Sequence, residues 1–469
     1  MAESKLVLGH LAHGFPLWPI KTVLKGEQLA AHMHVLGVSG TGKSKFLESI
    51  WTQLFQQGVG VTFMDPHGDS VLALMEYLVY KGYFDKPDAY QRLLYIEFRE
   101  EDWFLPFNIL RQQALPHTVA GNFREALHRA WPALSGGAAP MFDTLIQDGV
   151  KTLISNQLPV TCLYRMLTDK SYRNKLLEKE GDVEVVTFFR NQFDQMSQRD
   201  QVNAAGAALR RAHLLTFNPA LRYSLGQQEN LLDLAKVLDE GTSVLINLGG
   251  VQDQEARRLL GCLLTIGYEQ AALSRETGGR VRTRHHLIID EMGEFVANSE
   301  QGLSRMLSQT RKYNLFTVLA HQSWSQTTAR LRGALQNAQV EVAFGVGRED
   351  AEGMSRAIGR IDVEAVKSEA KTERTQPIFK EVSMQWEEQI QTLIDLPRQH
   401  AMVRMRTKPA VEIKTLSWPK FQIVAEEVQK VKDRYRELLM RPKEDIKLVH
   451  QQQEGAGEAR ASRTVRVER

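Results

Sequence analysis

The sequence predicts an α/β protein with a mainly parallel sheet and an all-helical insertion. A glycine-rich loop at residues 37–44 follows a short apolar segment typical of a strand and precedes a helical pattern of apolar residues. Strand-like segments alternate with amphipathic helices up to residue 105 and again over residues 241–417. Such alternation favours parallel strands joined by helices. Between these parts, residues 106–240 are rich in helical patterns and poor in strand signals.

The loop at residues 37–44 carries the first sign of chemistry. Gly37, Gly42, Lys43 and Ser44 fit G-x-x-x-x-G-K-[ST], the phosphate-binding P-loop. Glycines let successive backbone N–H groups face the phosphates, a lysine reaches the β- and γ-phosphates, and a hydroxyl can ligate Mg²⁺. We therefore predict a nucleotide site that takes ATP and Mg²⁺ and is formed by Gly37, Ser39, Gly40, Thr41, Gly42, Lys43 and Ser44.

Composition excludes several other classes of protein. The chain has 469 residues, 43% of them hydrophobic and 25% charged, so wholesale disorder is not expected. Two cysteines give neither a disulfide framework nor metal-ligand spacing. The net charge of +3 does not indicate a nucleic-acid binder, so any basic surface must be local. Because we find no apolar run of transmembrane length and no signal-peptide core, we predict a cytoplasmic protein.

A second motif lies at residues 285–291, where an apolar strand pattern ends in Asp290 and Glu291. This is the Walker B pattern, although many strands end in acidic turns and the pattern alone is weak. Together with the upstream P-loop, it predicts that Asp290, like Ser44, serves the metal and that Glu291 activates the attacking water.

Two further residues are weaker candidates. Gln322 ends the next strand pattern, where an amide can contact the γ-phosphate or its water; the alternative is an ordinary strand-cap glutamine. Arg311 ends a helical pattern and could act on a neighbouring subunit's phosphate as an arginine finger. On spacing alone, a solvated cation favoured by the helix dipole is the better interpretation of Arg311.

Several segments together resemble the HerA/FtsK superfamily of ring ATPases, in particular the cytosolic ATPase domain of type IV coupling proteins and HerA-like mobile-element ATPases. The resemblance covers most of residues 30–360 and rests on residues 37–44, 65–69, 107–108, 287–291, 311–315, 319–322 and 344–352. It implies a RecA-like core, a homo-hexamer, an arginine finger at Arg311 and a glutamine sensor at Gln322. The resemblance places Asp65 and His67 beside the nucleotide without fixing their role.

The chain departs from this family in its accessory parts. No amino-terminal transmembrane helices are found, and residues 1–31 are too few for the barrel that docks a nuclease on HerA. We expect residues 1–31 to be a lead-in packed on the core formed by residues 32–105 and 241–417. The insertion, residues 106–240, is interpreted equally well as a module facing DNA or a partner and as a solvated helical cap.

The carboxy-terminal third carries further expectations. We expect a loop or connector at residues 361–383 and two late strands, near 399–406 and 410–415, that pair at a sheet edge. Residues 418–441 are predicted to form a helix that docks on its own core or on the next subunit. The polar, arginine-ended stretch 442–469 is predicted to be a disordered tail.

These inferences lead to one preferred function and two alternatives. The preferred function is an ATP-driven ring that translocates DNA, with mostly backbone contacts and DNA-stimulated ATPase activity. A nuclease, a relaxase or a secretion channel would be its partner. The first alternative is an ATP-gated hexameric scaffold that recruits a nuclease or other effector without sustained translocation. The second is a monomeric signalling NTPase, which would not need Arg311.

Overall fold

The structure of the chain is a computed structural model. It describes residues 5–13, 20–112, 114–131, 141–275, 282–295, 300–327, 329–335, 338–362, 366–370, 376–406, 408–419 and 421–446. None of the helices in these ranges combines the length and apolarity that a membrane span requires.

The described residues form an 11-stranded sheet in the order β2-β1-β14-β13-β10-β3-β9-β8-β4-β7-β5. The strands from β10 to β5 in this order run parallel to their neighbours, whereas β13, β14, β1 and β2 are joined to the sheet and to one another by antiparallel pairing. The parallel strands are β3 (Met33–Leu36), β4 (Gly60–Asp65), β5 (Leu93–Arg99), β7 (Ser243–Gly250), β8 (His285–Ile289), β9 (Leu315–His321) and β10 (Val340–Ala343). The α/β class and the mainly parallel sheet are therefore confirmed.

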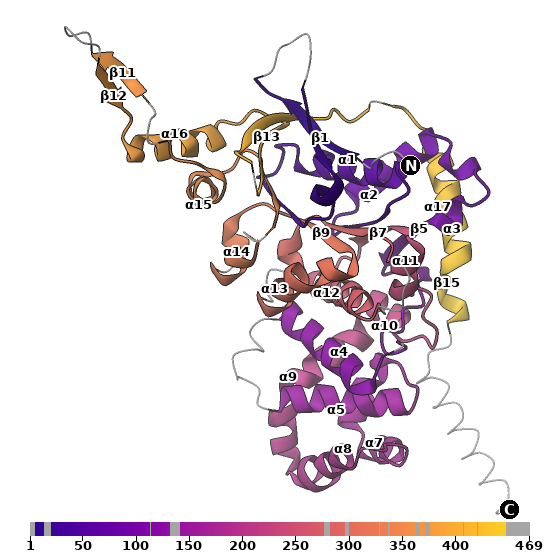
Figure 1. Ribbon diagram of the computed structural model, residues 1–469. Coiled ribbons are helices and arrows are strands. Elements are labelled where there is room, and N and C mark those ends of the chain that lie inside the picture. Colours follow the sequence, from indigo (N-terminus) through magenta and orange to yellow (C-terminus); the bar gives the residue numbers. More distant parts are fainter. Residues whose placement is uncertain are drawn as a thin grey trace, which may run out of the picture.

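Helices cover both faces of the sheet (Figure 1). One face packs against α1 (Lys43–Gln56), α2 (Asp69–Tyr80) and α17 (Ala425–Leu439), and the other against α12 (Gln254–Leu273). Successive strand residues point to opposite faces, so Val35 and Leu36 belong to different apolar clusters. This burial on two sides explains the near-continuous apolar runs of the parallel strands.

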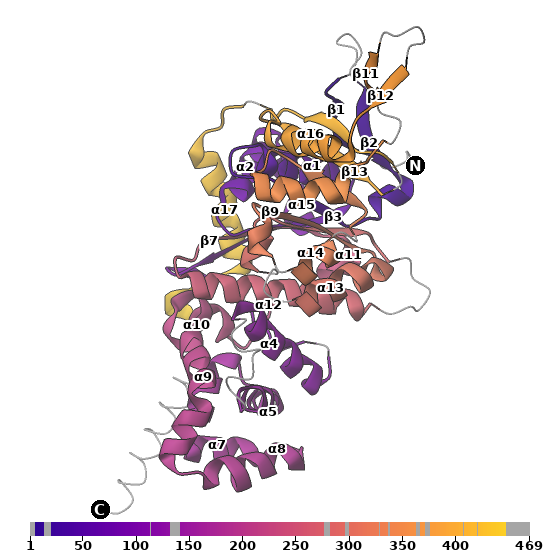
Figure 2. The same cartoon turned by 90° about the vertical axis from the view of Figure 1, so that its left-hand side faces the viewer.

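Most of the segment between β5 and β7 is helical, and much of it extends away from the sheet (Figure 2). Its helices are α4 (Pro116–Ala130), α5 (Phe142–Ser155), α6 (Leu163–Thr168), α7 (Lys170–Leu177), α8 (Val183–Thr187), α9 (Gln198–Phe217), α10 (Pro219–Leu225) and α11 (Leu234–Glu240). The helical path from Val183 to Gln195 is irregular, because α8 passes into a π-turn at Phe188–Gln192 and a 3₁₀ turn at Phe193–Gln195. The helix α4 packs against α12 and α5 and so joins the insertion to the core.

Two expectations about the carboxy-terminal third were wrong. Residues 361–383 contain a two-stranded sheet, β11 (Val366–Ala370) and β12 (Gln376–Phe379), which lies well away from the main sheet in Figure 1. The strands β13 (His400–Met405) and β14 (Val411–Thr415) do pair, but they are interior strands. The lead-in strands β1 (Lys5–Leu11) and β2 (Lys21–Lys25) continue the sheet beyond β14 and form its edge.

The remaining helices frame the site and close the core. After β8, the chain forms α13 (Glu300–Gln309) and α14 (Ala329–Leu335); α15 (Arg348–Ile358) and α16 (Val382–Ile394) follow β10, and the short α3 (Ala89–Arg92) precedes β5. The terminal helix α17 docks on its own core, where the Tyr435 hydroxyl donates to the Leu93 carbonyl at 2.6 Å. Beyond it, β15 (Arg441–Pro442) pairs with β6 (Trp103–Phe104). Most of the predicted tail, residues 447–469, lies outside the described residues.

Candidate active site

The P-loop connects β3 to α1 at the carboxyl edge of the parallel strands. Gly42 has a φ of 113°, a backbone conformation that favours glycine, and it lies directly before Lys43, the first residue of α1. Gly37 is required for a different reason: a Cβ atom there would lie 2.6 Å from the Cβ of Phe344. The two glycines therefore let the backbone curl between the end of β10 and the start of a helix, as phosphate binding requires.

Strand β8 lies between β4 and β9 and brings the acidic pair to the P-loop. The Nζ atom of Lys43 donates to Oε1 of Glu291 at 2.8 Å and lies 3.9 Å from Oδ1 of Asp290. The Ser44 hydroxyl donates to Oδ2 of Asp290 at 3.1 Å. Burial raises the pKa of Asp290 to about 6, against the opposing effect of Lys43. Two motifs about 250 residues apart thus form one buried charged cluster.

Gln322 joins the same cluster from the carboxyl end of β9. Its Nε2 atom donates to Oε1 of Glu291 at 2.8 Å, the oxygen that also accepts from Lys43. Glu291 itself has a φ of 50°, a left-handed conformation rarely adopted by residues other than glycine. That turn immediately after β8 directs the Glu291 carboxylate between Lys43 and Gln322.

Asp65 is the last residue of β4, the strand beside β8, and His67 lies in the turn after it. The Asp65 carboxylate accepts backbone N–H bonds from His67, Ser70 and Val71 at 2.9–3.2 Å. Asp65 is therefore fully engaged in shaping the turn into α2, while the His67 side chain is exposed. The negative charge of Asp65 also contributes to the raised pKa of Asp290.

Sequence reasoning missed a buried layer behind Gln322. His34 of β3 and His321 of β9 are stacked, with their Nε2 atoms 2.8 Å apart, and Trp324 packs on both rings. Burial lowers the pKa of both histidines, to about 4 for His321, so the pair is neutral near pH 7. Asp350 of α15 accepts from the Trp324 backbone N–H at 2.9 Å and fixes the chain just after Gln322.

The P-loop also has a neighbour that its motif does not predict. The backbone N–H of Gln399 donates to the Thr41 carbonyl at 2.8 Å, and its Cα would lie 3.3 Å from a Cβ atom added at Gly42. The α16–β13 connection therefore lies against the phosphate loop. Only tertiary pairing brings it there, because Gln399 is more than 350 residues further along the chain.

Arg311 is not part of this cluster. It lies in a 3₁₀ turn, Thr310–Tyr313, before β9 begins, whereas Gln322 follows the end of β9. Seven strand residues separate the two ends, which corresponds to roughly 20 Å. The Arg311 side chain is exposed, and within the described residues no hydrogen bond or ion pair engages it. Arg311 therefore cannot serve the nucleotide site of its own chain in this arrangement.

Oxygen ligands suited to Mg²⁺ are present beside Lys43. Mg²⁺ binds few protein oxygens and keeps waters and phosphate oxygens as its other ligands. The Ser44 hydroxyl and the Asp290 carboxylate, in mutual contact at 3.1 Å, fit that requirement. No group of three or more His, Cys, Asp or Glu residues that could hold a metal by themselves occurs among the described residues.

Comparison with protein families agrees with this arrangement. Residues 6–266, more than half of the chain, match the family model described as the central domain of the helicase HerA. The chain belongs to this family of HerA/FtsK-type ATPases. The resemblance stated from the motifs is thereby confirmed. Residues 284–398 of this HerA-family chain match a second model, described as the TraM recognition site of TraD and TraG.

Solved structures show the same fold. The bacterial conjugative coupling protein TrwB is 18% identical, with 84% of this chain and 86% of that chain covered and a TM-score of 0.59. VirB4 of Thermoanaerobacter pseudethanolicus is 15% identical, with coverages of 88% and 96% and a TM-score of 0.56. A TrwB structure in complex with ADP and Mg²⁺ has 16% identity, coverages of 84% and 87% and a TM-score of 0.56. No curated protein sequence matches the chain.

Proposed function

We propose that this protein is an ATP-hydrolysing motor that assembles as a homo-hexameric ring in the cytoplasm and moves DNA. The observation that carries the proposal is the oxygen Oε1 of Glu291, which accepts hydrogen bonds from both Lys43 and Gln322 at 2.8 Å. A P-loop lysine, a carboxylate and a strand-end amide so arranged suit hydrolysis of a nucleotide γ-phosphate. The HerA-family match and the fold shared with TrwB support the same conclusion.

Each residue of the cluster has a proposed role. Ser44 and Asp290 are the residues that would hold a Mg²⁺ ion, which would neutralise charge on the phosphates of ATP. Lys43 exchanges its contact with Glu291 for the β- and γ-phosphates, which frees the Glu291 carboxylate to take a proton from the attacking water. Gln322, which is hydrogen-bonded to Glu291, positions that water and contacts the γ-phosphate. The P-loop backbone from Gly37 to Gly42 cradles the phosphates.

Arg311 acts on a different subunit. Its exposed position about one strand length from the cluster suits a cation that is presented to the nucleotide of the neighbouring protomer. Such an arginine finger stabilises charge on the transferring phosphoryl group. Each active site then requires two chains, which makes ring assembly a condition for hydrolysis and disfavours a monomeric NTPase.

Coupling to DNA and to partners extends the proposal. A ring with a net charge of +3 per chain must place its basic residues locally, and phosphate contacts would make DNA binding sensitive to salt. TrwB is a conjugative coupling protein, and residues 284–398 match a model named for recognition of TraM by TraD and TraG. We therefore infer a partner from a DNA-processing or secretion assembly, such as a relaxase or channel component, with a nuclease as the other candidate.

DNA-dependent hydrolysis tests this function. ATPase activity is measured with and without single- and double-stranded DNA, with Lys43→Ala and Glu291→Gln as inactive controls, and is paired with a strand or roadblock displacement assay. We expect DNA to stimulate hydrolysis several-fold and ATP to drive displacement. Hydrolysis that DNA does not change, without displacement, would reject the motor and favour a ring that recruits an effector.

A further inference from the structure

The turn that carries Arg311 is held firmly although the Arg311 side chain is exposed. Its carbonyl groups accept from two arginines: Arg275 donates to the Tyr313 carbonyl at 2.8 Å, and Arg282 donates to the Lys312 carbonyl at 2.9 Å. Asn314 closes the turn with a φ of 59° and donates to the Arg282 carbonyl at 2.8 Å. The backbone of this exposed turn is therefore fixed from its carboxyl side.

A second anchor holds the turn from its amino side, through helix α13. Arg305 precedes Arg311 by six residues, which is roughly 9 Å of helix rise. The helix end between them is secured by side chains: Ser308 donates to the Arg305 carbonyl at 3.2 Å, and Thr310 donates to the Met306 carbonyl at 2.7 Å. A displacement of Arg305 is therefore passed to Arg311 along continuous, hydrogen-bonded backbone.

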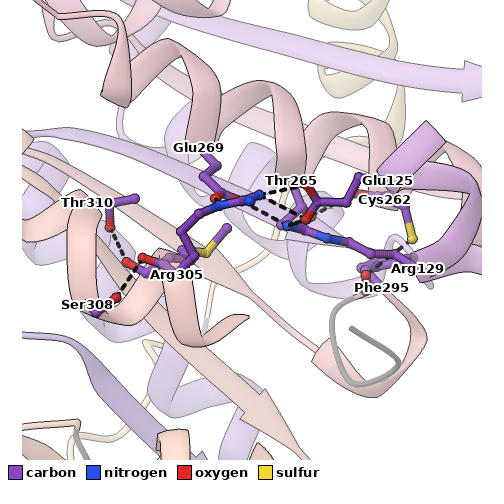
Figure 3. Close-up of polar contacts among 11 residues, drawn as sticks. Glu125, Arg129, Cys262, Thr265, Glu269, Phe295, Arg305, Ser308 and Thr310 are labelled. Atoms are coloured by element: carbon purple, nitrogen blue, oxygen red, sulfur yellow. Dashed lines mark hydrogen bonds and ion pairs between the residues drawn. The ribbon is translucent and has the colours of Figure 1, made fainter. Parts of the chain in front are cut away.

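Arg305 is one member of a four-charge cluster, formed with Glu125, Arg129 and Glu269 (Figure 3). It donates from Nη2 to both oxygens of Glu125, at 2.7 and 2.9 Å, and from Nε to Glu269. Arg129 completes the cluster with contacts of 2.5 Å to Glu125 and 2.9 Å to Glu269. Each carboxylate thus binds both guanidinium groups.

The cluster joins three parts of the molecule. Glu125 and Arg129 lie on α4 of the insertion, Glu269 lies on α12 under the sheet, and Arg305 lies on α13. Burial opposes ionisation of Glu125, but Arg129 and Arg305 outweigh it and lower the pKa of that carboxyl. With two cations and two anions the cluster has no net formal charge, which lessens the cost of removing these groups from water.

Helix α12 and the residues just beyond it provide both anchors of the Arg311 turn. Glu269 of α12 binds Arg305 before the turn, and Arg275, two residues beyond the end of α12, binds the Tyr313 carbonyl within it. The same helix touches the segment after Glu291, because the Cys262 thiol donates to the Phe295 carbonyl at 3.2 Å. We call the turn Thr310–Tyr313 the finger turn. The finger turn, the insertion and the segment after Glu291 are therefore all supported by α12.

We propose that Arg305 and Glu125 are positioning residues for Arg311, so that the helical insertion sets the arginine finger offered to the neighbouring subunit. This inference rests on the proposed role of Arg311 in trans. It gives the insertion a part in catalysis at the adjacent active site, although residues 125 and 311 are far apart in sequence. Contacts at Arg305 matter more than its charge alone, since one guanidinium serves two carboxylates.

Arg305→Met and Glu125→Gln are the variants of choice, because their side chains are partly exposed, at 33% and 23%. Arg129 and Glu269 are fully buried, and their loss would leave an unpaired interior charge that endangers folding. The matched control is Arg165→Met, an arginine 35% exposed in an ion pair with Asp169 elsewhere in the insertion. Arg305→Lys, which can serve one carboxylate at a time, should be intermediate.

The test mixes subunits in one ring and measures ATP hydrolysis. We expect Arg305→Met and Glu125→Gln alone to lower hydrolysis roughly ten-fold, with nucleotide binding unchanged. Addition of Lys43→Ala subunits, which are inactive themselves but carry an intact finger, should restore activity to the variant subunits' own sites. Loss that Lys43→Ala subunits do not relieve, in a ring where they do relieve Arg311→Ala, would overturn the inference.

Amide hydrogen exchange separates this inference from the proposed function. If Lys43→Ala subunits fail to relieve Arg311→Ala itself, the finger in trans is wrong. In either case, Arg305→Met should speed exchange in residues 305–313 several-fold while residues 37–44 keep the wild-type rate. Unchanged exchange at residues 305–313, or an equal effect at both segments and in Arg165→Met, would reject Arg305 as the anchor of the finger turn.

Discussion

At its carboxyl end, strand β9 delivers Gln322 into a buried cluster with Lys43 and Glu291, whereas at its amino end it follows an exposed turn that carries Arg311. At the carboxyl end, the functional side chains are hydrogen-bonded to one another, because one oxygen of Glu291 accepts from both Lys43 and Gln322. At the amino end, the backbone carbonyls of the turn are hydrogen-bonded, but the Arg311 side chain contacts no hydrogen-bond or ion-pair partner within the described residues.

Under the proposed function, this contrast means that one strand serves two active sites. The Gln322 end has what a nucleotide needs from its own chain: a phosphate loop, oxygen ligands for Mg²⁺ and a carboxylate. The Arg311 end has an exposed cation on a hydrogen-bonded turn, which is what the proposed finger would need.

Removal of the exposed cation should produce the largest effect. Arg311→Ala is expected to lower kcat about 1,000-fold, because an arginine finger supplies charge stabilisation in the transition state. Binding of a fluorescent ATP analogue should stay near the wild-type value, since Arg311 lies outside its own chain's cluster. The neighbouring exposed cation provides the control: Lys312→Ala should hydrolyse ATP at the wild-type rate, and equal losses in both variants would reject a specific finger.

The pH dependence of the free energy of unfolding tests the burial of Glu341, which lies on β10 of the main sheet. Burial raises the pKa of Glu341 from its usual 4.5 to about 7, against the opposing effect of Arg404. A carboxyl group with a higher pKa in the folded than in the unfolded protein does not reduce the free energy of unfolding below pH 4.5. That free energy then falls as the pH rises from 4.5 toward 7, because the folded protein holds the proton more tightly.

Because glutamine does not ionise, the Glu341→Gln variant should not lose stability in this way as the pH rises. The difference in free energy of unfolding between variant and wild type should therefore grow in favour of the variant by up to about 3 kcal/mol between pH 5 and pH 8. Urea unfolding at the two pH values measures it. A difference that does not change with pH would show that Glu341 titrates near its usual value in the folded protein.

Gln322→Ala should have a moderate effect that is confined to the cluster end. Loss of one hydrogen bond to a charged group corresponds to about 2 kcal/mol, or roughly 30-fold in kcat. Because the substitution leaves the P-loop and Lys43, which bind the phosphates, untouched, the affinity for ATP should change little. Single-turnover kinetics separates the two quantities, and a large rise in Kd with unchanged kcat would show that Gln322 acts in binding alone.

A substitution in the backbone of the finger turn should have the smallest effect on hydrolysis and should act mainly on stability. Asn314→Ala places alanine at a φ of 59° and removes a hydrogen bond to the Arg282 carbonyl, which together should cost about 2 kcal/mol of stability. Asn314→Gly keeps the conformation accessible and loses only the hydrogen bond, so it should cost less. Thermal unfolding compares them; an alanine variant as stable as the glycine variant would mean that the turn relaxes.

The sequence was most informative where chemistry is local. The residues of the cluster follow strand ends or begin the helix after the P-loop, all in short motifs, and parallel strands bring such ends to one edge of the sheet. The α/β class follows from the same alternation of strands and helices. By contrast, the pairing of β1 with β14 joins residues about 400 positions apart, and no periodicity in residues 1–31 predicts it.

Other features depended on which elements become neighbours. The His34–His321 pair exists because β3 adjoins β9, and the cluster of Glu125 with Arg305 exists because α4 packs on α12. The charged stretch at 361–383 lacked an alternating pattern, so its two strands were not predicted. Arg311 shows the limit most clearly, because its proposed partner belongs to another chain.

Complementation between two inactive variants tests the shared active site most directly. Lys43→Ala removes the phosphate contact and leaves Arg311 intact, while Arg311→Ala removes the finger and leaves the cluster intact. Each variant alone should be inactive. When the two are mixed in equal amounts and allowed to exchange subunits, they should regain ATP hydrolysis at sites where the intact cluster of an Arg311→Ala subunit faces the intact Arg311 of a Lys43→Ala subunit. A mixture that stays as inactive as its two components, in rings shown to contain both chains, would contradict the account.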